Sequence, residues 1–117
     1  MLRLLQATCN TWNGLLAAAR SERAFQQELI LLVVAVPLAF VVASGAWLRV
    51  ALIGVVLLVL IVELLNTALE KLADEVTREL NPGIGQVKDI ASAAAGLTQL
   101  LAALVWVVAL CERFGWL

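Results

Sequence analysis

The chain has 117 residues, of which 63% are hydrophobic and only 15% are charged, with a mean hydropathy of +1.00. A soluble domain is nearer half apolar and a quarter charged, so this composition excludes an ordinary soluble protein. It predicts one integral membrane domain over residues 1–117. The net charge of −1 identifies no class of partner, because the positions of the charges matter more than their sum.

The first 27 residues predict an amphipathic helix lying on the membrane surface. Apolar residues recur at helical spacing, whereas polar residues fall elsewhere on the helical wheel. The segment lacks the uninterrupted apolar core of a signal peptide, so we expect it to remain in the mature protein. It ends in a charged lead-in, "SERAFQQE". The apolar positions are Leu5, Cys9, Trp12, Leu16 and Ala19.

Three later stretches, 29–48, 50–69 and 90–111, are predicted to cross the membrane. The first has 20 residues without a charge, and at about 1.5 Å per residue this length matches the roughly 30 Å apolar core of a bilayer. The runs are continuous rather than alternating and too long for one barrel strand, which argues against strands. The sequence therefore predicts an all-α membrane protein with a surface helix, three transmembrane helices and a loop over 71–89.

The Lys and Arg residues predict the orientation of these spans. Six of the eight lie before the first span or between the second and third, and positive residues favour the cytoplasmic side. The N-terminus and the 71–89 loop are therefore expected in the cytoplasm and the C-terminus in the periplasm. The six are Arg3, Arg20, Arg23, Lys71, Arg78 and Lys88; Arg49 and Arg113 fall on the opposite side.

Acidic and amide residues follow one face of the second span. Glu63, Asn66, Thr67, Glu70 and Asp74 are spaced i, i+3, i+4, i+7 and i+11. A carboxylate within a membrane costs a few kcal/mol unless it is partnered or hydrated, so such residues usually mark function. A polar seam between helices is the alternative, and it explains Asn66 or Thr67 alone equally well. It does not require two acids.

Further polar residues are expected at the same depth. Glu22 and Glu28 flank the entry of the first span, and Lys88 and Asp89 stand at the entry of the third. Each pair alone is typical of an interfacial anchor. Together, the acids suit Mg²⁺, which binds a few carboxylates plus substrate phosphates, and the Lys suits phosphate. The chain has no His and no G-x-x-x-x-G-K-[ST] sequence, which argues against a zinc site and a P-loop.

Three segments carry a family resemblance. "SERAFQQE", "VELLNTALEKLAD" and "VKDIASAAAG", with the spacing between them, closely resemble the small bacterial membrane diacylglycerol kinases over essentially the whole chain. The resemblance implies a homotrimer of three-span subunits in the bacterial inner membrane. It also implies an enzyme that uses Mg-ATP to phosphorylate diacylglycerol to phosphatidic acid. The similar undecaprenol kinases make undecaprenol the alternative acceptor.

A protein of another class is the rival interpretation. A small proton-coupled transporter would explain Glu63, but it would leave Glu22, Glu70 and Lys88 at one interface without a reason. A purely structural membrane subunit explains still less of the sequence.

The resemblance also implies roles for individual residues. Glu63 would be the general base at the lipid hydroxyl, Glu22 and Glu70 would hold the Mg²⁺, and Asn66 would orient its neighbours. The nucleotide would be bound by Arg3, Asn10, Glu22, Glu70, Glu79, Leu80, Asn81, Lys88 and Asp89. The lipid substrate would lie along Arg3, Glu28, Arg49, Glu63, Ser92 and Trp106. Asn10 stands where relatives often carry an aromatic residue, and Asn81 where many carry His.

Small residues in "ASAAAG" predict a close helix contact. Ala91 with Ala95, and Ser92 with Gly96, are spaced i and i+4. The contact could join two subunits or two helices of one subunit, and the sequence favours neither.

Overall fold

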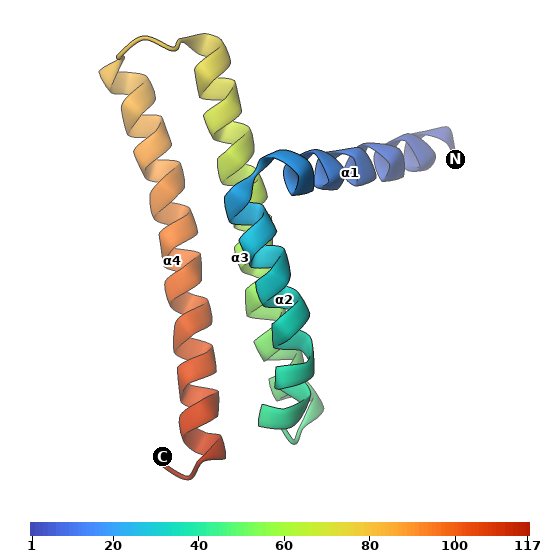
Figure 1. Cartoon of the computed structure of the whole chain (residues 1–117). Coiled ribbons are helices and arrows are strands. Elements are labelled where there is room, and N and C mark those ends of the chain that lie inside the picture. Colours follow the sequence, from blue (N-terminus) through green and yellow to red (C-terminus); the bar gives the residue numbers. More distant parts are fainter.

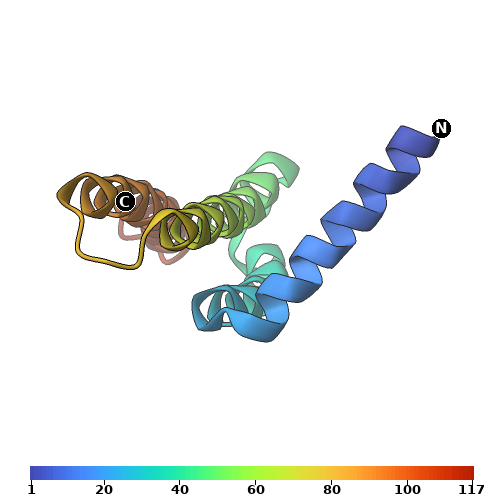
Figure 2. The same ribbon diagram turned by 90° about the horizontal axis from the view of Figure 1, so that it is seen from above.

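The computed structural model describes residues 1–117 as four helices, α1 (Leu2–Ser21), α2 (Arg23–Val42), α3 (Ala46–Val76) and α4 (Pro82–Arg113). The absence of strands confirms the predicted all-α class. By length and composition, α2, α3 and α4 could each cross a membrane. These three run along one another, whereas α1 projects sideways from the bundle (Figure 1). Seen from above, α3 and α4 lie side by side and α1 points away from them (Figure 2).

Two helix boundaries in the first half of the chain differ from the predicted segments. The helix expected over 1–27 ends at Ser21, because the backbone of Glu22 is extended. The apolar run 29–48 is not one helix, since α2 ends at Val42 and α3 begins at Ala46. The turn between them is made of small, uncharged residues. Hydropathy therefore does not distinguish this turn from the helices on either side.

Residues 71–89, predicted as a cytoplasmic loop, are helical for most of their length. Only residues 77–81 separate α3 from α4. Residues such as Leu, Ala, Glu and Lys favour helix whether or not they lie in a membrane, so α3 continues past its apolar part. At the other end, the side chain of Asn81 accepts hydrogen bonds from the backbone N–H groups of Gly83 and Ile84. With Pro82 in the first turn, Asn81 starts α4 well before its apolar run.

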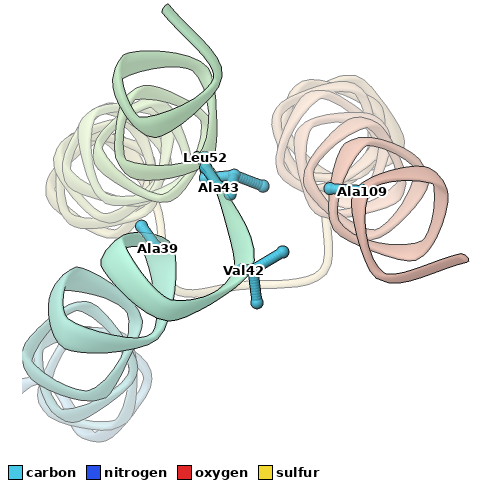
Figure 3. Packing of buried hydrophobic residues seen from close by; sticks show 5 residues of the cluster. All are labelled: Ala39, Val42, Ala43, Leu52 and Ala109. Atoms are coloured by element: carbon cyan, nitrogen blue, oxygen red, sulfur yellow. The ribbon is translucent and has the colours of Figure 1, made fainter. Parts of the chain in front are cut away.

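Few side chains are buried within the chain. Only 16 of 117 residues are buried, and most large apolar side chains face outward, as expected of a protein surrounded by lipid or by further copies of itself. One core cluster lies where α2 turns into α3 beside the end of α4 (Figure 3). Most of its members are small, which lets the helices approach closely. They are Ala39, Val42, Ala43, Leu52 and Ala109.

A second cluster fixes the junction of α1 and α2 against α3. Ala18 and Phe25 come from the two sides of the junction and pack with Leu60 of α3. Glu22 lies between Ala18 and Phe25 in the sequence. The cluster therefore holds Glu22 beside the polar part of α3, which carries the predicted acids.

The small-residue stripe of α4 has two sides with different surroundings. Ala91 and Ala95 are buried within the chain, whereas Ser92 and Gly96 are exposed. Nothing lies within 4 Å of a Cβ placed on Gly96. The Ala91–Ala95 side therefore packs within one subunit, and the Ser92–Gly96 side is open.

Candidate active site

The structure gathers three of the other predicted acids around Glu63. Glu63 lies on α3 and is half-buried. Two further acids are close enough for their charges to interact with it. They are Glu70, about two turns further along α3, and Glu22, at the junction of α1 and α2. Glu28 of α2 interacts with Glu63 in the same way. Three separate segments thus contribute carboxylates to one site, which sequence spacing alone could show only for α3.

Glu22 contacts a cation that the sequence did not assign to the site. The Nζ atom of Lys71 lies 3.3 Å from Glu22 Oε1. The position of Lys71 directly after Glu70 could have indicated that it belongs to the site. The sequence analysis used Lys71 only to predict the orientation in the membrane. The contact shows that the Glu22 carboxylate is placed to receive a positive charge.

The residues present fit Mg²⁺ better than a metal held by protein alone. No group of three or more His, Cys, Asp or Glu side chains is arranged to hold a metal ion. Mg²⁺ needs only one or two carboxylates when substrate phosphates and water complete its shell. Glu22 and Glu70 supply two carboxylates whose charges interact with Glu63. One of these carboxylates, that of Glu22, already forms an ion pair with Lys71.

An apolar cavity of about 340 Å³ lies among α2, α3 and α4 beside the acid cluster. Glu28 and Trp106, both predicted to face the lipid, line this cavity together with Gln99. The indole Nε1 of Trp106 donates a hydrogen bond of 3.1 Å to the carbonyl oxygen of Leu52, which holds the ring in place. The sequence analysis missed Gln99, which lies seven residues after Ser92 in α4.

Two buried oxygens of this region have no hydrogen-bond partner. They are Oε2 of Glu28, whose residue is only 9% exposed, and Oδ1 of Asn66. Buried polar atoms are nearly always paired, so each unpaired one needs an explanation. A ligand or a second subunit that supplies a donor would satisfy both.

A second cavity, of about 400 Å³, separates α1 from α3. Its polar lining includes Asn10 and Thr11 of α1, Thr67 and Lys71 of α3, and Glu22. Asn10 is therefore on the same cavity as a predicted metal ligand. The acid cluster reaches this cavity through Glu22 and the apolar cavity through Glu28.

Lys88 is bonded to Asp74 at the polar end of the α3–α4 hairpin. Its Nζ atom lies 2.6 Å from Asp74 Oδ1. Asp74 lies beyond the apolar part of α3, and the hydrogen bond from Lys88 lowers the pKa of its carboxyl. The pair joins α3 to α4 and fixes the position of Lys88.

Other predicted residues lie away from Glu63. Arg3 is exposed near the projecting start of α1. Arg49 precedes Glu63 by 14 residues of α3, about 21 Å along the helix axis. Glu79, Leu80 and Asn81 form the exposed α3–α4 turn, and the side-chain oxygen of Asn81 is used as a helix cap. Asp89 and Ser92 are exposed on α4.

These features define a small helical membrane enzyme whose acids gather beside an apolar cavity. Residues 9–110 match the family described as prokaryotic diacylglycerol kinase. The chain belongs to this family. Membership confirms the kinase interpretation and does not favour the transporter or the structural subunit.

Several relatives support the assignment over most of their length. The chain is 38% identical to the diacylglycerol kinase of Escherichia coli K12 over 113 residues, which cover 97% of this chain and 93% of that protein. It is 41% identical to the diacylglycerol kinase of Pseudomonas aeruginosa over 104 residues, 89% of this chain and 85% of that protein. The corresponding enzyme of Haemophilus influenzae is 31% identical over 106 residues, 91% and 90% of the two chains.

Proposed function

We propose that the chain transfers the γ-phosphate of ATP to the hydroxyl of diacylglycerol, giving phosphatidic acid and ADP, at the acid cluster around Glu63. One observation carries this proposal. Glu22 lines the cavity between α1 and α3, Glu28 lines the apolar cavity, and Glu63 interacts with both acids. The cluster therefore lies between two cavities: one against α1 that offers the nucleotide the polar groups of Asn10, Thr11 and Lys71, and one among α2, α3 and α4 that suits the lipid.

Glu63 acts as the general base in this proposal. The hydroxyl oxygen of the lipid forms a bond to the γ-phosphorus, and the bond from that phosphorus to the β–γ bridging oxygen breaks. The hydroxyl proton passes to the Glu63 carboxylate, and ADP leaves. Such a reaction depends on positioning and charge neutralisation more than on covalent help from the protein. The lipid hydroxyl lies at headgroup level, so Glu63 lies near the end of a span rather than at its centre.

Glu22 and Glu70 hold Mg²⁺, which supplies neutralisation of the phosphate charge when it is bound. Asn66, one turn from both Glu63 and Glu70 on α3, orients the acids. Asn10 contacts the nucleotide from the α1 side of the cavity. The remaining contacts come from Arg3, the turn 79–81, Lys88 and Asp89, of which Lys88 is already oriented by Asp74.

The apolar cavity receives part of an acyl chain, with Glu28 near the headgroup and Trp106 as a fixed wall. Its lining is apolar apart from Glu28, Gln99 and the indole of Trp106. Ser92 and Arg3 complete the lipid surface. Arg49 lies at the other end of α3. It belongs to the same lipid surface, past the end of the acyl chain.

The proposal places the chain in the bacterial inner membrane as a homotrimer with a cytoplasmic N-terminus. The Lys and Arg distribution supports this orientation. The outward apolar surface, the open Ser92–Gly96 side of α4 and the unpartnered oxygens of Glu28 and Asn66 support contacts with further subunits.

Purified protein in mixed micelles tests the function. Incubation with Mg-ATP and diacylglycerol is expected to give phosphatidic acid, and Glu63→Gln in the same micelles is the control for a contaminating kinase. Folded protein that makes no product above this control would overturn the proposal. A strong preference for undecaprenol would establish the alternative acceptor.

A further inference from the structure

Lys71 is the only positively charged residue that lines the cavity of about 400 Å³ between α1 and α3. Glu22 is the only negatively charged residue of the same lining, and the two side chains form the ion pair of 3.3 Å described above. Asn10 and Thr11 of α1 add neutral polar groups. The one cation of this cavity therefore lies next to a proposed metal ligand.

No other carboxylate of the chain is available to Lys71. Asp74, about one turn further along α3, is bonded to Lys88 at 2.6 Å. Glu70 directly precedes Lys71, and adjacent residues of a helix do not face each other. Glu22 is thus the only ion-pair partner of Lys71 in the chain. If Lys71 leaves Glu22, its next anion has to come from outside the protein.

The proposed reaction requires Lys71 to change its partner. Two cations repel each other at one carboxylate, so Glu22 can serve Mg²⁺ only after its contact with Lys71 is broken. The Lys71 side chain is 61% exposed and ends a flexible four-carbon stem, so it can turn away from Glu22 without disturbing either helix. The nucleotide brings a suitable anion into the same cavity, because a lysine ammonium is a common partner of phosphate.

We propose that Lys71 is a phosphate-binding residue that exchanges the Glu22 carboxylate for a phosphate oxygen of the nucleotide. This inference rests on the proposed function and adds to it a coupling between the metal and the nucleotide. The contact between Lys71 and Glu22 opposes binding of the metal alone. When metal and nucleotide bind together, Lys71 loses this contact and gains a stronger one with the more highly charged phosphates. Lys71 therefore weakens the binding of the metal alone and strengthens the binding of the metal–nucleotide complex.

Isothermal titration calorimetry of the purified protein in micelles separates the two effects. The ligands are Mn²⁺ alone and the complex of Mn²⁺ with a non-hydrolysable ATP analogue, both without diacylglycerol. Lys71→Met should bind Mn²⁺ alone up to about fivefold more tightly, because the competing ion pair is lost. It should bind the metal–nucleotide complex about tenfold more weakly, because a charge-assisted contact with phosphate is lost. A role of Lys71 in folding alone would change both affinities in the same direction.

Two further variants are the controls. Lys71→Arg keeps the positive charge and should bind both ligands much as the unsubstituted protein does. Arg20→Met removes an exposed charge near the end of α1, outside the cavity, and should leave both affinities unchanged. An equal loss of nucleotide affinity in Arg20→Met would overturn the proposal, since any positive charge at this surface would then have the same effect.

The exchange would also be overturned if Lys71→Met bound the metal–nucleotide complex as tightly as the unsubstituted protein does, or if it bound both ligands more weakly. Neither result contradicts the proposed function, which is tested separately by the formation of phosphatidic acid. Folded, unsubstituted protein that makes no phosphatidic acid would overturn that function and this inference with it.

Discussion

The Lys71 ammonium lies 3.3 Å from the carboxylate of Glu22. A positive side chain of α3 therefore lies next to a proposed Mg²⁺ ligand. The two side chains are 61% and 30% exposed, and such pairs contribute little to folding. Their importance is local. Before the metal can use this carboxylate, Lys71 has to leave it.

Lys71→Met is therefore expected to strengthen metal binding without destabilising the fold. The pair contributes at most about 1 kcal/mol, so the affinity for Mn²⁺ in the absence of nucleotide should rise by no more than about fivefold. Electron paramagnetic resonance of free Mn²⁺ measures this change. Lys71→Arg keeps the charge and is the control. Weaker Mn²⁺ binding by Lys71→Met would show that Lys71 assists the metal rather than competing with it.

The acids of the cluster should fail in different ways when their charge is removed. Glu70→Gln and Glu22→Gln weaken the metal site, so a higher Mg²⁺ concentration should restore part of the turnover. Glu63→Gln removes the proton acceptor, which typically contributes about 10²–10⁴-fold, and Mg²⁺ should not restore it. Its ATP affinity should change little, because the lost interaction matters as the hydroxyl attacks. Kinetic measurements over a range of Mg²⁺ concentrations distinguish the two patterns. Near-normal turnover of Glu63→Gln would remove its assignment as the base.

The bond between Lys88 and Asp74 predicts a pH dependence at the polar end of the hairpin. Because Lys88 lowers the pKa of the Asp74 carboxyl, the pair should stabilise the fold at neutral pH. This stabilisation should disappear as the pH falls through the lowered pKa, since the acid is then protonated. Carbon-13 NMR of the Asp74 carboxyl follows the titration directly. In Lys88→Met the pKa should return toward its ordinary range, whereas an unchanged titration would show that the bond does not persist in solution.

Filling the apolar cavity should impair the use of long acyl chains. Ala103 lines the cavity and is exposed, so Ala103→Trp is expected to fold while it narrows the space. Turnover of long-chain diacylglycerol should fall about tenfold, in line with the effect of methylene-sized changes in apolar pockets. Short-chain diacylglycerol should be affected much less. Leu101→Trp, on the same helix but outside the cavity, is the control. An equal loss for both chain lengths would place the acyl chain elsewhere.

The orientation can be tested with reporters that act on one side of the membrane. A reporter active only in the periplasm should be active when fused after Leu117 and silent when inserted near Gly83. The physical basis is the excess of Lys and Arg around the polar end of the bundle. The reverse result would put the acid cluster outside the cell, away from ATP, and would contradict the proposed function.

The part of the candidate site that lies on α3 was predictable, because one helix contains it. The spacing of Glu63, Asn66 and Glu70 needs only the helical period to place them on one face, and α3 does run through all three. The charge-free runs also identified three helices that could cross a membrane. The helix boundaries were less predictable, because the turn at 43–45 is as uncharged as the helices on either side of it. In addition, α3 continues beyond its apolar part.

By itself, the sequence determined the class of the protein: its composition, the period of its apolar residues and its three motifs already indicate a helical membrane lipid kinase. Only the tertiary structure decided which side chains meet. The Ala18–Phe25–Leu60 cluster brings Glu22 to Lys71, and the closeness of α2 to α3 brings Glu28 to Glu63. The packing of α4 also buries Ala91 and Ala95 and leaves Ser92 and Gly96 exposed. The physical reason is that helical periodicity fixes relations along one helix. Relations between helices depend on side-chain packing that no single segment contains.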